Sequence, residues 1–218
     1  MSMEPVRISL SEPATAPAHD HVPPPAGAMI EALRSLGYTL QSAVADIVDN
    51  SISAGATRIE VQLNWNDGDA NVSVLDNGCG MDLPTLINAM RPGSRNPLEM
   101  RAAGDLGRFG MGLKTASFSQ CRCVTVATKT RAGTTGVRRW DLDHVARTGD
   151  WQLLHGFHPG SEKQQECLDS LSQGTLVLWE RLDRLIGGGS KQGTDHNRKQ
   201  FWQQVARLQE HLASTFHI

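Results

Sequence analysis

The chain has 218 residues, of which 39% are hydrophobic and 20% are charged, and its formal net charge is −2. These values predict a folded domain with a sizeable core and exclude a chain that is disordered throughout. The small net charge gives no argument for nucleic-acid binding, and no apolar run approaches the ~18 residues that a membrane span requires. Residues 1–25 lack a basic start followed by an apolar stretch, so we expect a cytoplasmic protein without a secretory signal.

The cysteines and histidines show no pattern typical of a metal site or a disulfide framework. The four cysteines are Cys79, Cys121, Cys123 and Cys167, and no C-x-x-C spacing occurs among them. The eight histidines include no H-E-x-x-H motif. We therefore expect reduced thiols and no structural zinc.

Hydrophobic periodicity and turn residues predict alternating helices and strands. In chain order these are helices over 28–36 and 40–53, strands over 57–64 and 71–75, a helix over 82–91, a helix over 110–119, strands over 122–129, 137–141 and 175–180, and a helix over 198–214. Gly37 separates the first two helices, and Gly55 ends the second. The turn Asn66-Asp67-Gly68-Asp69 joins the first two strands as a hairpin.

The pattern divides the chain into a tail, one folded domain and a final helix. Residues 1–27 are proline-rich and predict a disordered tail. Residues 28–186 predict the folded domain, with a long loop rich in Gly, Pro and Arg over about 91–109. Residues 187–197 predict a flexible loop, and residues 198–218 predict a C-terminal helix that leads toward a further domain.

Asp46 and Asn50 are the first candidate site residues. They are four positions apart on the second predicted helix and therefore lie on the same face, while Ile47 and Val48 turn to the core. The amide oxygen of Asn50 is a suitable ligand for Mg²⁺, and the carboxylate of Asp46 can accept a proton from an attacking water. Alone, the spacing is more typical of the polar face of an ordinary amphipathic helix than of a nucleotide site.

Three glycine-containing motifs follow. The segment Asp76-Asn77-Gly78-Cys79-Gly80-Met81 comes directly after a predicted strand, where a carboxylate can accept a hydrogen bond from an exocyclic amine and glycines allow close approach of a flat ligand. The segment 107–114 (GRFGMGLK) precedes a helix, whose free N–H groups favour an anion. Gly174-Thr175 opens the last predicted strand. Taken singly, these segments also fit a plain strand-to-helix turn, a flexible connection and an ordinary strand start.

Together and in this order, the four motifs resemble the GHKL ATPase superfamily (Bergerat fold), which includes type II topoisomerase ATPase domains, ninety-kilodalton heat-shock chaperones, histidine kinases, MutL and MORC proteins. The resemblance covers residues 28–180, and the segment from Asp49-Asn50-Ser51 to Ala54-Gly55-Ala56 is most similar to MutL and MORC proteins. It implies an α+β fold, a two-layer α/β sandwich with a mixed, mainly antiparallel sheet and helices on one face. Pattern alone predicts only an α+β protein with glycine-rich loops.

The resemblance also implies roles for individual residues. Asn50 corresponds to the ligand that links Mg²⁺ to the triphosphate, Asp76 to the adenine reader, and Thr175 to a residue that supports the adenine site through Asp76. Residues 91–109 resemble the lid over ATP. The other positions that match ATP-binding motifs are Gly78, Gly80, Met81, Gly107, Arg108, Phe109, Gly110, Met111, Gly112, Leu113 and Lys114.

The chain departs from the family at the general base. The family carries Glu where this chain has Asp46, and Asp is one methylene shorter. A carboxylate misplaced by ~1 Å can cost ~100-fold in rate. The helix could sit closer, Asp49 could help, or hydrolysis could be slow; we favour slow hydrolysis.

The implied function is a Mg²⁺-dependent ATPase that acts as a nucleotide-gated switch and forms a homodimer when nucleotide is bound, with DNA or an effector protein as its target and no membrane partner. In such relatives a lysine from a following domain contacts the γ-phosphate, so we expect this chain to be a piece of a longer protein. Two alternatives stay open. A histidine kinase-type domain needs a phosphoacceptor histidine on an upstream helix pair, whereas His19 and His21 lie in the proline-rich tail. A non-catalytic ATP-binding module is the other.

Overall fold

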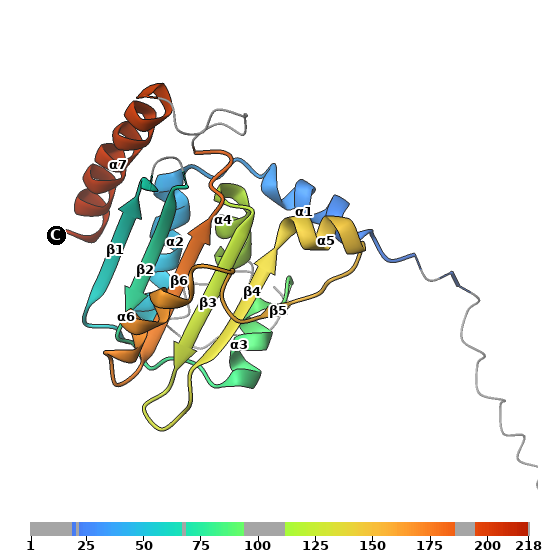
Figure 1. Cartoon of the computed structure of the whole chain (residues 1–218), viewed down its shortest axis with the longest axis horizontal. Coiled ribbons are helices and arrows are strands. Elements are labelled where there is room, and N and C mark those ends of the chain that lie inside the picture. The colour runs from blue at the N-terminus through green and yellow to red at the C-terminus, as the bar shows by residue number, and fades with distance from the viewer. Residues whose placement is uncertain (1–18, 21, 67–68, 94–111, 186–194, 218) are drawn as a thin grey trace, which may run out of the picture.

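Six strands form one antiparallel sheet in the order β1-β2-β6-β3-β4-β5 (Figure 1). The structure is a computed structural model that describes residues 19–20, 22–66, 69–93, 112–185 and 195–217. The strands are β1 (Ile59–Asn64), β2 (Asn71–Asp76), β3 (Cys123–Lys129), β4 (Gly136–Asp141), β5 (Leu154–His155) and β6 (Gly174–Glu180). Every ladder between these strands is antiparallel.

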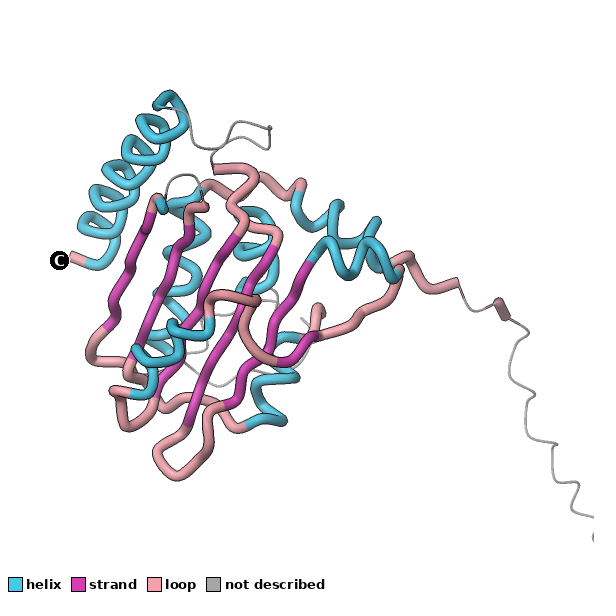
Figure 2. Tube along the Cα trace, viewed as in Figure 1, coloured by secondary structure: helices cyan, strands magenta, loops and turns pink. Residues whose placement is uncertain are grey.

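Seven α-helices are described in the same residues. They are α1 (Ala26–Arg34), α2 (Leu40–Ser53), α3 (Leu83–Met90), α4 (Gly112–Gln120), α5 (Leu142–Thr148), α6 (Gln165–Asp169) and α7 (Asp195–Phe216), and a short 3₁₀ turn, Glu162–Gln164, precedes α6. Figure 2 shows how the helices surround the sheet. None of the helices in the described part of the chain has both the length and the apolar character needed to cross a membrane.

The two faces of the sheet carry different cores, because successive side chains on a strand point to opposite faces. On one face, Val74, Val126 and Trp179 pack with buried residues of α1, α2 and α4 in the main core. On the other face, Leu176 and Leu178 form a smaller cluster with Leu168 of α6, among others. The expected two-layer α/β sandwich is thereby confirmed, with the short α6 added on the face opposite the main helices (Figure 1).

The predicted helices and strands all occur, with bounds that differ by a few residues. The sequence did not predict three short elements, α5, β5 and α6. For α5 a local signal was present: the Asp141 side chain accepts hydrogen bonds from the backbone of Asp143 and His144, and Gly149 follows the helix with φ 71°. The strand β5 has only two residues, too few for a periodic pattern.

Helix α2 is the element that positions the candidate site. Thr39 caps its N-terminus in a reciprocal pair with Ser42, and Gly55, with φ 72°, follows its C-terminus. Its apolar residues, including Val44, Ile47 and Val48, are buried. This packing fixes which side of α2 faces the core and leaves Asp46 and Asn50 on the other side.

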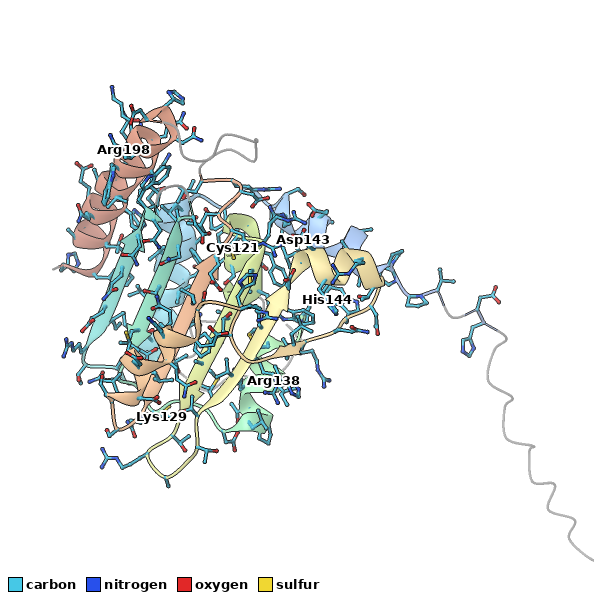
Figure 3. The ribbon with its side chains drawn as sticks, viewed as in Figure 1. Cys121, Lys129, Arg138, Asp143, His144 and Arg198 are labelled. Carbon is cyan, nitrogen blue, oxygen red and sulfur yellow. The ribbon has the colours of Figure 1, made fainter. Side chains whose placement is uncertain are left out.

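A buried arginine fixes the C-terminal end of α4. Arg34 of α1 donates from Nη1 to the carbonyls of Phe118 and Cys121 at 2.8 Å each, and from Nη2 to Asp183 at 2.6 Å. A cation is favourable at a helix C-terminus, where the last carbonyls lack intrahelical partners. Figure 3 labels Cys121, which directly follows α4.

Helix α7 packs beside the edge strand β1 (Figure 1). The spacing predicts an apolar stripe of Phe201, Val205, Leu208 and Leu212, of which the first three are buried and Leu212 is half-buried. The rings of Phe201 and Trp65 have centroids 5.4 Å apart. The predicted lid of residues 91–109 lies largely outside the described residues, as do most of the predicted tail and the loop preceding α7.

Candidate nucleotide-binding site

Asp46 and Asn50 lie one turn apart on the side of α2 that faces away from the core, as the spacing predicts. Asp46 is half-buried and Asn50 is exposed. The N-terminus of α4 lies against Asp46, because a Cβ atom added to Gly112 would lie 3.6 Å from Oδ2 of that carboxylate. The structure therefore brings together Asp46 of the first sequence motif and Gly112 of the third, which are 66 positions apart in the chain.

Asp49 adds a second carboxylate next to Asp46. Partial burial raises the pKa of Asp49, and the negative charge of Asp46 raises it further. The two carboxylates thus make this side of α2 acidic. A cation bound between them and a triphosphate would reduce the repulsion between these negative charges.

Asp76 ends strand β2 and is buried, with 5% of its surface exposed. Its Oδ2 accepts a hydrogen bond from the Ser51 hydroxyl at 2.9 Å, and its Oδ1 accepts one from the Gly78 amide at 2.8 Å. Burial raises the pKa of Asp76, while the hydrogen bonds from Gly78, Ser51 and the Thr175 backbone oppose that rise. A ligand amine would be a further donor to the charged form, so such a ligand and the ionised carboxylate stabilise each other.

The glycines after Asp76 are required by the protein's own packing. A Cβ atom on Gly80 would lie 1.9 Å from the carbonyl oxygen of Lys129, and Gly80 has φ 65°. Figure 3 labels Lys129 near the end of β3. A Cβ atom on Gly78 would lie 2.9 Å from Ala54, the residue that caps the C-terminus of α2. These contacts hold the loop between α2 and β3, and the role of both glycines in approaching a base stays a prediction.

Replacing Gly80 by Ala is expected to lower the free energy of unfolding by about 3 kcal/mol, because it combines a strained positive φ with a clash against backbone. Denaturant unfolding of the whole chain measures this change. The matched control is Gly27→Ala in α1, where the added Cβ would lie 3.5 Å from its nearest neighbour and which should leave stability nearly unchanged or slightly raised. An equal, small effect of both substitutions would contradict the packing role of Gly80.

Thr175 lies opposite Asp76 in the β2–β6 ladder, and its support of an adenine site through Asp76 stays a prediction. Its hydroxyl is 2.9 Å from that of Thr128, which also donates to the Gly174 carbonyl and accepts from the Met81 amide, each at 2.9 Å. A threonine hydroxyl has one proton and two lone pairs, so these three partners satisfy Thr128 when Thr175 is the donor. The chain of hydrogen bonds fixes Met81 relative to β6.

Lys114 has a different partner from the one that its motif predicts. Its side chain is buried, and Nζ donates to the carbonyl of Ala89 at the end of α3 at 2.8 Å. An ammonium group has three N–H donors, so this bond leaves the predicted contact with a phosphate open, and that role stays a prediction. Leu113 is half-buried in the same turn. The remaining residues of the third motif lie outside the described residues; they are Gly107, Arg108, Phe109, Gly110 and Met111.

Sequence reasoning missed three polar residues that hold the site together. Ser51 binds Asp76, Thr128 binds Met81, and Tyr38 donates from its hydroxyl to Oδ2 of Asp46 at 3.0 Å. Ser51 directly follows Asn50 and could have been found from that adjacency. Thr128 and Tyr38 carry no local signal, because their partners come from other elements.

An apolar groove of about 320 Å³ lies elsewhere, between α2, β1 and α7. Its lining includes Val48, Ile52, Ile59, Val61, Leu212 and Phe216. Val48 and Ile52 lie on a different side of α2 from Asp46 and Asn50, since residues two apart on a helix do not share a face. The groove is therefore separate from the polar site.

Comparison with known proteins matches this arrangement to a family. The model of the histidine kinase-, DNA gyrase B- and HSP90-like ATPase family matches residues 38–175. The DNA mismatch repair protein MutL of Nostoc punctiforme is 43% identical over 152 residues, which cover 66% of this chain and 22% of that protein. MutL of Pelotomaculum thermopropionicum is 37% identical over 101 residues, or 44% of this chain and 16% of MutL. Mouse ATPase MORC2B is 35% identical over 81 residues, or 36% of this chain and 8% of MORC2B.

The chain thus spans less than a quarter of the length of each of these relatives. The matched region of the family model begins at Tyr38 and ends at Thr175, so it contains α2, the Asp76 loop and the start of β6. All four motifs lie inside it, the last of them, Gly174-Thr175, at its end.

Proposed function

We propose that the chain binds ATP with Mg²⁺, hydrolyses it slowly and acts as a nucleotide-gated switch. The premise is that the chain belongs to the histidine kinase-, DNA gyrase B- and HSP90-like ATPase family. It is a GHKL ATP-binding domain similar to those of MutL and MORC proteins. The observation that carries the proposal is the buried Asp76 carboxylate, held by Ser51 and Gly78 at the end of β2. A buried carboxylate needs donors, and adenine offers one in its exocyclic amine.

Adenine would bind against the loop that follows β2. Asp76 would accept a hydrogen bond from the exocyclic amine, while its contacts with Ser51 and Gly78 keep the carboxylate oriented. Thr175 would support the same carboxylate from β6, since its backbone hydrogen bond opposes the rise that burial causes in the pKa of Asp76. Because the Asp76 carboxylate is a hydrogen-bond acceptor, it favours adenine, which offers an amine donor, over a base that carries a carbonyl at the same position.

The donor set on α2 fits Mg²⁺ better than a metal that needs a full protein cage. The described residues contain no group of three or more His, Cys, Asp or Glu side chains that could hold a metal ion. Mg²⁺ binds through one or two protein oxygens together with substrate phosphates and water. Asn50 would supply the protein oxygen, and the ion would neutralise charge on the triphosphate.

Asp46 would act as the general base of hydrolysis. The oxygen of a water molecule forms a bond to the γ-phosphorus, the bond to the β–γ bridging oxygen breaks, ADP leaves with that electron pair, and the proton of the water passes to Asp46. Because Asp is one methylene shorter than the Glu of the family, we expect the carboxylate to reach the water imperfectly and turnover to be slow.

The switch would operate through the lid and a second copy of the chain. ATP would order residues 91–109 over the nucleotide, and two chains would close as a homodimer. MutL is named as a DNA mismatch repair protein and MORC2B as an ATPase. By analogy with these relatives, we extend the proposal to DNA or an effector protein as the target of the closed state.

Calorimetric titration of the 218-residue chain with a non-hydrolysable ATP analogue, with and without Mg²⁺, tests the binding proposal. The expected result is one binding site whose affinity increases with Mg²⁺. The variant Glu166→Gln, exposed on α6 at the opposite face of the sheet, serves as the control and should bind equally well. No binding at millimolar analogue would overturn the proposal.

Phosphate release then separates the three candidate activities. Slow release that depends on Asp46 is the expected result. Tight binding without any release would favour a non-catalytic module. Stable phosphohistidine after incubation with labelled ATP would favour a kinase.

A further inference from the structure

Tyr38 connects the start of α2 to the carboxylate of Asp46. Its hydroxyl donates a hydrogen bond to Oδ2 of Asp46 at 3.0 Å, although the two residues are eight positions apart. Gly37, with φ 75°, makes the turn that precedes Tyr38, and Thr39 caps α2 directly after it. The chain thus reverses at this point, and the tyrosine side chain lies along the helix that it precedes.

The backbone of Tyr38 is held from two sides. Its carbonyl accepts a hydrogen bond from Nε2 of Gln120 at 3.2 Å, and Gln120 is the last residue of α4. Thr39 and Ser42 fix the next turn through the capping pair. The ring itself is half-buried against the main core. The hydroxyl is therefore presented by a side chain whose position the fold determines.

The raised pKa of Tyr38 keeps its hydroxyl protonated and therefore a hydrogen-bond donor. Burial raises the pKa of Tyr38, and the hydrogen bond to Asp46 and the negative charge of Asp46 raise it further. A phenol with a pKa above its ordinary value stays protonated near neutral pH and can only donate to the carboxylate. The bond uses one carboxylate oxygen, and the other can accept a proton.

We infer that Tyr38 is a positioning residue for Asp46: its hydroxyl fixes the short carboxylate beside the N-terminus of α4. The same oxygen, Oδ2, accepts the hydrogen bond from Tyr38 and lies 3.6 Å from the position that a Cβ atom on Gly112 would take, so the carboxylate is in reach of both the tyrosine and the start of α4. A glutamate has an additional rotatable bond, whereas an aspartate held by a phenol has less freedom to leave its position. This inference rests on the proposed role of Asp46 as general base.

The first arm of the test is spectroscopic and does not require turnover. Tyr38 is the single tyrosine of the chain, so incorporation of fluorotyrosine gives one fluorine NMR resonance for the folded protein. Titration of that resonance reports the pKa of Tyr38. Asp46→Ala is expected to shift the resonance and to lower the pKa, because two of its causes are removed. Asp49→Asn, one turn further along α2, is the control and should leave the pKa unchanged.

The second arm is kinetic. Tyr38→Phe removes only the hydroxyl and is expected to lower kcat for ATP hydrolysis by about tenfold, the scale of a lost hydrogen bond and a displaced catalytic group. The dissociation constant of the non-hydrolysable analogue should not change. In an Asp46→Ala background the same substitution should have no further effect on the residual rate, since its partner is already absent.

The outcomes separate this inference from the function on which it rests. If Asp46→Ala leaves turnover unchanged, or the chain does not hydrolyse ATP, the proposed base is wrong and the inference fails with it, whatever the fluorine titration shows. If Asp46→Ala removes turnover but Tyr38→Phe does not, the inference alone is wrong. A tyrosine pKa that does not respond to Asp46→Ala also overturns it, and an equal loss from Tyr38→Phe in both backgrounds contradicts an action through Asp46.

Discussion

The variant Asp76→Asn is expected to bind ATP about 100-fold more weakly than the parent chain and to remain folded. A hydrogen bond to a charged group contributes about 1.5–3 kcal/mol, and the amide nitrogen of Asn would in addition place a donor against the donor of adenine. Inside the protein the exchange is tolerated. The Asn oxygen can accept from the Gly78 amide, and its nitrogen can donate to the Ser51 hydroxyl, which is also within hydrogen-bond distance of the Ile47 carbonyl.

The pKa of Asp76 supports this expectation for stability. Because burial raises that pKa in the folded chain, the protonated form of Asp76 favours folding below the unfolded-state pKa, and this contribution is lost as the pH rises through the raised value. Asn carries no charge to desolvate. Asp76→Asn should therefore not reduce the free energy of unfolding through loss of the ionised carboxylate at neutral pH.

Calorimetry with ATP and with a purine nucleotide that carries a carbonyl in place of the exocyclic amine measures the effect. The parent chain should prefer ATP, and Asp76→Asn should lose that preference. Ser51→Ala, which removes one support of the same carboxylate, should weaken ATP binding by a smaller factor. Unchanged ATP affinity in a folded Asp76→Asn chain would remove Asp76 from the adenine site.

The second large effect is expected at Asp46, where Asp46→Asn should lower kcat by about 100-fold, the lower end of what a general base contributes. The amide keeps the shape of the side chain and can still accept a hydrogen bond from the Tyr38 hydroxyl, but it cannot take a proton from water. The affinity for the non-hydrolysable analogue should not fall, because the substitution changes the reacting step and leaves Asn50 and Asp76 in place.

A steady-state phosphate assay on the parent chain, Asp46→Asn and Asp46→Glu distinguishes a short reach from an absent base. Asp46→Glu should preserve or raise turnover if reach limits the parent chain. An inactive Asp46→Glu would mean that the pocket is built around Asp, with Tyr38 and the α4 N-terminus too close for the longer side chain. Asp46→Asn with the turnover of the parent chain would show that another group accepts the proton.

The order of elements could be predicted because each carries its own local pattern. The buried residues of α2 recur at helical spacing, apolar and polar residues alternate along β1, and the caps Thr39 and Asp82 stand where the two helices α2 and α3 begin. The elements α5, β5 and α6 were missed because they are short, at seven, two and five residues. A short element has too few residues for a helical or strand period to be recognised in the spacing of its apolar residues.

The candidate site likewise combines residues that the sequence could name with contacts that only the folded structure shows. Asp46, Asn50 and Asp76 could be named from spacing, since helix geometry places the first two on one face and the end of a predicted strand places the third. The partner of Lys114 could not, because Ala89 belongs to α3 and meets α4 only in the folded chain. The reason for Gly80 could not either: the spacing suggested room for a ligand, whereas the nearest atom is the carbonyl oxygen of Lys129.

The sequence by itself determined an α+β fold class through periodicity, and its motifs, each contiguous along the chain, indicated the family and named the candidate site residues. The tertiary structure decided which groups hold those residues in place: Ser51 against Asp76, Thr128 against Met81, and Tyr38 against Asp46. Each pair joins segments between eight and forty-seven positions apart. Contacts of that kind depend on sheet register and helix packing, which no local pattern specifies.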